Sequence, residues 1–261
     1  MERVFHDSDI TLASRFECKY VISPLLVPAL REFVQPFARP DRFAASRSDG
    51  RYPICSLYLD SEDLLLYQQT AGGEKNRFKL RVRSYADDES APLFFEVKRK
   101  VNNIVQKRRA RVPRDRAWAL LDGRLERDLA ALDPEFEYFA SHMDLVSARP
   151  LVRVRYMREA YESIAGDPVR VTLDTELMHV GTFDVDVRHD RGRWVTTPVE
   201  GVILELKFTE IFPSWVRDLV RVFGLKQQPV PKYVLSVDHM LLGGREAVMS
   251  VGGFTLPVRR A

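Results

Sequence analysis

The sequence predicts an α+β fold, in which helices flank a mainly antiparallel sheet. Strand-like segments follow one another in hairpin-like succession and helix-like segments lie at the margins, which favours α+β over a doubly wound parallel sheet. The strand-like segments lie at about 15–22, 53–60, 77–85, 93–100, 103–112, 151–162, 168–174 and 201–208. The helix-like segments lie at about 24–36, 61–70, 114–131, 134–145, 212–224 and 233–242.

Residues at the segment boundaries support these elements. The strand-like segments are rich in Val, Ile, Leu, Phe and Tyr, or alternate apolar with charged residues. The helix-like segment at 61–70 begins with Asp60 or Ser61 as a suitable N-cap, because either side chain can accept a hydrogen bond from a free N–H of the first turn. Pro113 and Pro134 mark the starts of two further helices, where the missing N–H costs little.

The segment KLRVRSY shows an unusual alternation. Successive side chains of a strand point to opposite faces, so Leu80 and Val82 share one face while Lys79, Arg81 and Arg83 share the other. Surface strands more often carry Thr, Ser, Gln and scattered charge at their outward positions. Three consecutive cations on one face would also repel one another unless an anion compensates them.

The same alternation recurs in five further segments. Their charged faces carry Glu96 and Lys98; Lys107, Arg109 and Arg111; Arg153 and Arg155; Arg170, Thr172 and Asp174; and Glu205 and Lys207. An ordinary amphipathic sheet with a solvated face would explain any one of these strands, but it explains six of them less well. If helices cover the apolar faces, the charged faces can meet inside a barrel. Such an interior needs a polyanion, and carboxylates among the cations invite a divalent metal ion.

Composition narrows the function classes. The 261 residues include 40 basic and 37 acidic side chains, a net charge of +3, which argues against a surface that coats nucleic acid. The segment QKRRARVPRDR could form a nucleic-acid patch, but its basic residues alternate as in a strand. Two cysteines are too few for a disulfide framework, no apolar segment resembles a signal peptide, and no apolar run could span a bilayer. We therefore expect a cytoplasmic protein with no nucleic-acid partner and no transmembrane segment.

Eight segments, taken in order, resemble a known family. They are RFECKY, ICSLYLDSEDLLLY, RFKLRVRSY, FFEVKRKVNNIVQKRR, LVRVRYMREAY, VRVTLDTEL, GVILELKF and PKYVLSVD. Together they are similar to the VTC domain, the polyphosphate polymerase domain of the vacuolar transporter chaperone, which belongs to the triphosphate tunnel metalloenzymes and is close to the CYTH group. The resemblance implies one domain over residues 1–261, with a core at about 13–242. It also implies a closed antiparallel β-tunnel, or barrel, with a charged interior flanked by helices.

The resemblance, together with the shared strand faces, implies roles for particular residues. As catalytic residues we expect Arg81, Arg83, Lys98, Lys107 and Lys232. As phosphate-binding residues we expect Lys19, Lys79, Arg109, Arg153, Arg155, Arg170 and Lys207. Glu205 resembles the metal-ligating glutamate of the family, with Glu96 and Glu17 as further ligands of Mn²⁺ or Mg²⁺. The implied reaction transfers the γ-phosphate of ATP to a growing inorganic polyphosphate chain and releases ADP.

Two departures from the family pattern bear on the activity. The hydrolytic members of the superfamily carry ExExK on the first strand, whereas Arg15 replaces the first acid here. That change disfavours metal-directed attack by water and supports a polymerase. Pro231 stands where the family has a serine before Lys232, so one phosphate contact is missing. Two alternatives stay open: a triphosphatase or nucleotide cyclase on the same tunnel, and a non-catalytic module that binds polyphosphate or a nucleotide.

Overall fold

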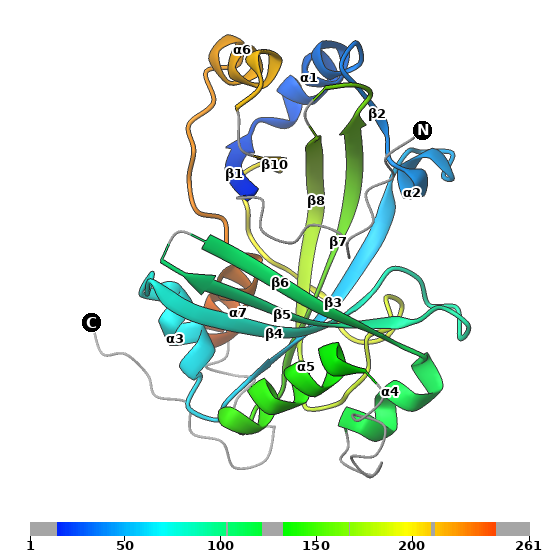
Figure 1. Cartoon of the computed structure of the whole chain (residues 1–261), viewed down its shortest axis with the longest axis vertical. Coiled ribbons are helices and arrows are strands. Elements are labelled where there is room, and N and C mark those ends of the chain that lie inside the picture. The colour runs from blue at the N-terminus through cyan, green and yellow to red at the C-terminus, as the bar shows by residue number, and fades with distance from the viewer. Residues whose placement is uncertain (1–14, 103, 122–132, 167, 210–211, 244–261) are drawn as a thin grey trace.

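The computed structural model describes residues 15–102, 104–121, 133–166, 168–209 and 212–243 (Figure 1). The strands are β1 Arg15–Ile22, β2 Ala38–Pro40, β3 Tyr52–Asp60, β4 Asn76–Ser84, β5 Leu93–Val101, β6 Ile104–Val112, β7 Arg149–Ser163, β8 Val169–Gly181, β9 Val195–Thr196 and β10 Val202–Thr209. The helices are α1 Val27–Val34, α2 Arg42–Ala45, α3 Leu65–Ala71, α4 Arg114–Leu121, α5 Pro134–Leu145, α6 Ser214–Val222 and α7 Lys232–Gly243; a 3₁₀ turn, Pro24–Leu26, precedes α1.

One antiparallel sheet organises the described chain. Its strands follow the order β1-β10-β8-β7-β3-β4-β5-β6, with β2 paired to β7 and β9 paired to β8. The α+β prediction is therefore confirmed. The predicted closure of the barrel is not confirmed, because the path ends at β1 and β6 and these two strands do not pair within the described residues.

The sheet nevertheless curls strongly. The Nζ atom of Lys98 on β5 lies 2.9 Å from a carboxylate oxygen of Glu17 on β1, although five strands separate β1 from β5 along the sheet path. In Figure 1 the β4-β5-β6 part of the sheet accordingly crosses in front of β7 and β8. The face that carries Glu17 and Lys98 is therefore concave, and we call it the inner face.

Helices cover the apolar outer face in two places. Phe136 and Phe139 of α5 and Leu66 of α3 pack on β3–β6, where Phe95 is a central buried side chain. Leu30 of α1, with Val216 and Leu219 of α6, packs on the outer residues of β1, β8 and β10. These layers bury the alternate apolar positions, and the intervening charged positions consequently point to the inner face.

Helix α7 covers part of the inner face itself. Tyr233, Val234 and Val237 pack against apolar inner residues such as Ile54 and Val154. The inner face is thus divided into an apolar end beneath α7 and a charged remainder. No helix in the described part of the chain combines the length and apolarity that crossing a membrane requires.

Most predicted element boundaries agree with the structure to within a few residues, with two instructive exceptions. Helix α3 begins at Leu65 rather than at 61, because residues 61–64 form a turn that ends with Leu64 at φ 59°. The Asp60 carboxylate still caps this helix, since it accepts the backbone N–H groups of Leu66 and Tyr67 at 2.8 Å each. Strand β8 continues to Gly181, well beyond 174, past a bulge near Glu176. The part of the predicted 114–131 helix after 121 lies outside the described residues.

Candidate functional site: the charged inner face

Strand register brings most of the predicted site residues together. Directly opposed residues of antiparallel strands project to the same side of the sheet, and Arg81 is opposed by Tyr58 on β3 and by Glu96 on β5. Continuing across the sheet, the inner face carries Lys79, Arg83, Lys98, Lys107, Arg109, Arg158, Arg170, Asp174, Glu205, Lys207, Lys19 and Glu17, and Lys232 of α7 reaches it from the side. Cations clearly outnumber carboxylates on this face.

Glu96 is the centre of a cationic cluster on β4, β5 and β6. Its side chain is fully buried. One carboxylate oxygen accepts Arg81 Nε at 2.5 Å, and the other accepts Arg109 Nε at 2.7 Å and lies 3.2 Å from Lys107 Nζ. Burial opposes ionisation, but these cations hold the pKa of Glu96 well below its usual value. Glu96 therefore orients three cations through both of its oxygens, and its expected part as a metal ligand stays a prediction.

A second cluster joins β1, β10 and β5. Glu17 lies 2.9 Å from Nζ of Lys19 and 2.9 Å from Nζ of Lys98, while Glu205 lies 3.5 Å from Lys207 and 3.8 Å from Lys19. Although burial opposes it, the charges of Lys98, Lys19 and Lys207 lower the pKa of Glu17 well below its usual value. Burial lowers the pKa of Lys98 and of Lys207, so each of these ammonium groups is costly to keep charged.

A third cluster contains Arg158 and Asp174, neither of which is among the expected site residues, although the alternation places Asp174 on a charged strand face. Arg158 donates two hydrogen bonds to Asp174, at 2.6 and 2.7 Å, and Lys232 Nζ lies 2.7 Å from the same carboxylate. Arg158 also lies 3.6 Å from Glu205 and stacks over the Tyr156 ring at 5.3 Å. Despite burial, Arg158 and Lys232 lower the pKa of Asp174. Arg158 could have been selected by its parity with Val152 and Val154, but only the register shows that this parity faces inward.

Two inner cations have no carboxylate partner within the described residues. Burial, followed by the charges of Lys98 and Lys19, lowers the pKa of Lys79 well below its usual value. Arg83 is buried and donates to two neutral hydroxyl groups, Ser56 Oγ at 3.1 Å and Tyr156 Oη at 3.3 Å. A bound anion would relieve both environments, because it would offset the repulsion around Lys79 and give Arg83 a charged acceptor.

Arg170 lies at the margin of the inner face. Its guanidinium group donates to Asp41 at 2.6 Å and to the Tyr52 hydroxyl at 3.2 Å, and it also pairs with Glu162. Two carboxylates and a phenol already satisfy this side chain, so it has less capacity for a phosphate group than Lys79 or Arg83.

Arg153 and Arg155 are not on the inner face, so the expectation that they line the charged interior is wrong. Arg153 is opposed by Leu57 on β3, and Leu57 is in turn opposed by Val82, both outer-face residues. The physical reason is that both faces of β7 carry cations, at odd-numbered and at even-numbered positions. The inward positions 152 and 154 are valines that pack in the apolar core with α7.

Glu17 and Glu205 form a donor set that fits a magnesium or manganese ion shared with phosphate. The described residues contain no group of three His, Cys, Asp or Glu side chains arranged to hold a metal ion. Mg²⁺ usually binds one or two carboxylates and completes its shell with water and substrate phosphate oxygens. Two carboxylates on neighbouring strands, both close to Lys19, therefore fit such an ion better than they fit an all-protein site.

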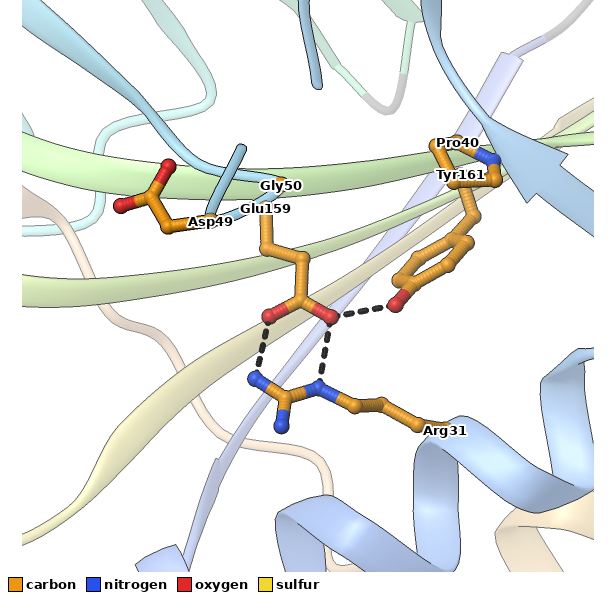
Figure 2. Close-up of a pocket in the computed structure, with 6 residues that line it drawn as sticks. All are labelled: Arg31, Pro40, Asp49, Gly50, Glu159 and Tyr161. Carbon is orange, nitrogen blue, oxygen red and sulfur yellow. Dashed lines mark hydrogen bonds and ion pairs between the residues drawn. The ribbon is translucent and has the colours of Figure 1, made fainter. Parts of the chain in front are cut away.

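A separate pocket lies on the outer side of β7 (Figure 2). Arg31 of α1 donates to both carboxylate oxygens of Glu159, at 2.8 and 2.6 Å, and the Tyr161 hydroxyl contacts the same group. Asp49 and Gly50 also line the pocket. Arg31 pairs with Glu159, and Asp49 pairs with Arg51 at 3.4 Å, so the charged residues that line this pocket are compensated and the inner face is the better candidate for the functional site.

Comparison with known proteins gives one family and several distant structures. The family model of the VTC domain matches residues 14–241. No match was found among curated proteins. The chain is similar to the structure of a candidate adenylate cyclase from Bacillus halodurans, with 11% identity, 84% of this chain and 94% of that chain covered, and a TM-score of 0.47. It is also similar to a candidate adenylate cyclase from Vibrio parahaemolyticus, with 12% identity, 87% of this chain and 99% of that chain covered, and a TM-score of 0.47. A third similar structure is protein PH1819 of Pyrococcus horikoshii, with 14% identity, 89% of this chain and 99% of that chain covered, and a TM-score of 0.42.

Proposed function

The chain belongs to the VTC domain family, and from this premise we propose that it is a metal-dependent polyphosphate polymerase. In the proposed reaction the γ-phosphate of ATP is transferred to the end of an inorganic polyphosphate chain and ADP is released. We further propose that the edges at β1 and β6 enclose a bound polyanion as a tunnel, and that the protein works in the cytoplasm, where ATP is available. The observation that carries the proposal is the excess of cations on the inner face.

Two inner cations that have no carboxylate partner among the described residues support polyanion binding. Lys79 lies two positions before Arg81 on β4, and Arg83 lies two positions after it. The three charged groups therefore follow one line along the strand. An extended phosphate chain carries charge at regular intervals and can contact such a line at several points. Arginine adds forked contacts to phosphate oxygens, whereas lysine adds an adjustable point charge.

Phosphoryl transfer requires positioning and neutralisation of charge more than covalent chemistry by the protein. Glu96 fixes Arg81, Lys107 and Arg109 before substrate arrives, so these cations need little reorganisation when negative charge develops on the transferred group. Lys98 projects from the next inner position of β5, between this cluster and Glu17. We propose that Arg81, Lys98, Lys107 and Arg109 contact the phosphoryl group while it is transferred.

Glu17 and Glu205 are the residues that would hold the metal ion. When bound, a divalent cation would neutralise phosphate charge and polarise the transferred phosphoryl group. Lys19, between the two carboxylates, would hold an adjacent phosphate oxygen. Position 15 bears on the choice of acceptor, because Arg15 replaces an acid that orients water in the hydrolytic relatives described above. A cation there favours an anionic phosphate acceptor over water.

The deciding experiment separates the products formed from ATP and Mn²⁺. Long polyphosphate chains with ADP would support the polymerase, free phosphate alone would indicate a triphosphatase, and no turnover would indicate a binding module. We expect Arg83→Ala to abolish synthesis without unfolding the protein. Arg108→Ala is the matched control, because Arg108 pairs with Glu135 on the outer face at 2.8 Å. Wild-type synthesis by Arg83→Ala, at saturating ATP, would refute the assignment of the inner face.

A further inference from the structure

Arg153 and Arg155 belong to a second cationic centre on the outer face. The segment 184–194, which leads into β9, crosses β7 here, and Trp194 stacks over both guanidinium groups at 5.2 and 4.6 Å. Arg155 donates to the carbonyl oxygen of His189 at 2.6 Å. The segment is also tied to the 85–92 loop, because Asp87 accepts the backbone N–H of His189 at 2.8 Å.

Buried polar atoms without partners gather at this centre. Within the described chain, Arg153 Nε, Arg114 Nη1, Trp194 Nε1 and both ring nitrogens of His189 are buried and have no hydrogen-bond partner. Arg153 and Arg114 are each 6% exposed, so neither side chain is open to bulk water. A buried donor without an acceptor is costly. The arginine and tryptophan atoms are all donors, so they require an acceptor rather than another donor.

The neighbouring acids do not supply that acceptor. Asp186 lies 3.8 Å from Arg153, but its oxygens already accept the backbone N–H and the guanidinium group of Arg188. Asp87 is used by backbone N–H groups of the 184–194 segment, and it lies 3.7 Å from the His189 ring. Neither Arg114 nor Arg155 forms an ion pair with a carboxylate in the described part of the chain. The centre is therefore rich in positively charged donors.

The backbone of the covering segment is shaped around these donors. Gly192 has φ 108°, in the region that favours glycine, and a Cβ atom there would lie 2.5 Å from Arg153 Nη2. A residue with a side chain would be strained at this φ and would displace the Arg153 guanidinium group. Arg188 and Arg191 lie at the rim with 40% and 65% of their side chains exposed, so positive charge continues from the buried centre to the surface.

We propose that this centre binds a tetrahedral oxyanion, with phosphate as the chemical class. A phosphate group presents several charged acceptor oxygens, which could accept from Arg153, from the Trp194 indole beside it and from Arg114, each of which has a buried donor without a partner. The sheet separates this centre from the inner face, so a phosphate bound here would not be the group that reacts there. The inference does not depend on the polymerase activity, because it uses none of the inner-face residues.

The indole signals of the three tryptophans provide a direct test. In a ¹H–¹⁵N spectrum the Trp194 Nε1–H signal is identified by its loss in Trp194→Phe, and inorganic phosphate is then titrated into wild-type protein. We expect this signal to move downfield and to saturate, because the indole N–H gains an acceptor, whereas the Trp215 signal on α6 stays in place. Chloride at matched ionic strength should have no effect. Tripolyphosphate in a parallel titration distinguishes free phosphate from the end of a longer chain.

Variants separate this centre from the inner face. Arg153→Met should weaken phosphate binding by about tenfold or more, as expected for a lost charge-assisted hydrogen bond. Arg155→Gln, at a partly exposed position, should weaken it in the same direction and serves if Arg153→Met does not fold. In Arg81→Ala the Trp194 signal should still respond. An immobile Trp194 signal in wild type, an unchanged response in both outer-face variants, or a response lost in Arg81→Ala would overturn the inference. The last result would assign phosphate binding to the inner face alone and leave the proposed function intact.

Discussion

Replacing Glu205 by glutamine should change polyanion affinity in opposite directions with and without metal. In the free protein the Glu205 carboxylate lies 3.5 Å from Lys207, 3.6 Å from Arg158 and 3.8 Å from Lys19. A polyanion that binds without metal must draw these cations away and then face the carboxylate. Glu205→Gln removes that competitor, so we expect tighter binding in metal-free buffer. With Mg²⁺ present the same change removes a metal ligand, so we expect weaker binding.

The size of both effects can be worked from these distances. One pair of unit charges at about 4 Å is worth about 1 kcal/mol in water and about 4 kcal/mol at an effective dielectric constant near 20. Because Lys207 keeps 39% of its side chain exposed and Lys19 keeps 23%, values near the aqueous limit apply. A net gain of about 1–3 kcal/mol in metal-free buffer corresponds to about five- to 150-fold tighter binding. With Mg²⁺ present, the affinity for polyanion should fall by at least about tenfold. Replacing even a residue that only hydrogen-bonds to a metal ligand typically lowers metal affinity by that much.

The assay is calorimetric titration of tripolyphosphate into each protein, once with EDTA and once with saturating Mg²⁺. Glu135→Gln is the matched control, because Glu135 is also held by an arginine, at 2.8 Å, but on the outer face. The control should match wild type in both buffers. If Glu205→Gln shifted the affinity in the same direction in both buffers, Glu205 would be an ion-pair partner and not a metal ligand.

Three further predictions concern charge on the inner face. Tripolyphosphate binding should take up protons at a pH between the lowered pKa of Lys79 and the ordinary lysine value of 10.5, and Lys79→Met should abolish this uptake, measured as buffer-dependent heat. Although burial opposes ionisation, Arg83 and Arg109 lower the pKa of Tyr85 to about 8, so a tyrosinate absorbance should appear near that pH and vanish in Tyr85→Phe. Tripolyphosphate at a hundredfold excess over Kd should stabilise the fold by about 2.7 kcal/mol, less at high salt; a shift insensitive to salt would contradict an ionic site.

The alternation of apolar and charged residues was sufficient to predict the sheet and most of its inner face. It assigned Arg81 and Arg83 to one face and Leu80 and Val82 to the other, and the register confirms this. Barrel closure could not be decided in this way, because alternation describes faces and carries no information about whether β1 meets β6. The resemblance to a tunnel family supplied that expectation, and the described strands do not pair there.

The wrong and the missed predictions of site residues share one physical cause. Alternation shows which side chains of a strand lie together, but it cannot show which of the two faces points inward when both carry cations. In β7, Arg153 and Arg158 differ in parity, and the inward parity is fixed by Tyr52 and Tyr58 of β3, which are opposed by Arg158 and Val152. Only pairing with a strand of known orientation resolves such a case. Asp174 was missed for a related reason, because its role depends on the opposed Arg158.

The inner cations can be ranked by how well the protein itself satisfies them, and this ranking separates structural from ligand-binding parts. Arg158 and Lys232 share a buried carboxylate with short contacts, so replacing either would leave Asp174 short of a partner and should cost stability first. Among the described residues the hydrogen-bond acceptors of Arg83 are neutral hydroxyl groups, and Lys79 is surrounded by other cations. For Arg83 and Lys79 a bound polyanion would supply the negative charge that the fold does not. Substitutions there should reduce polyanion binding while the free protein stays folded, and Lys79→Met should even raise its melting temperature, because it removes a repelled charge.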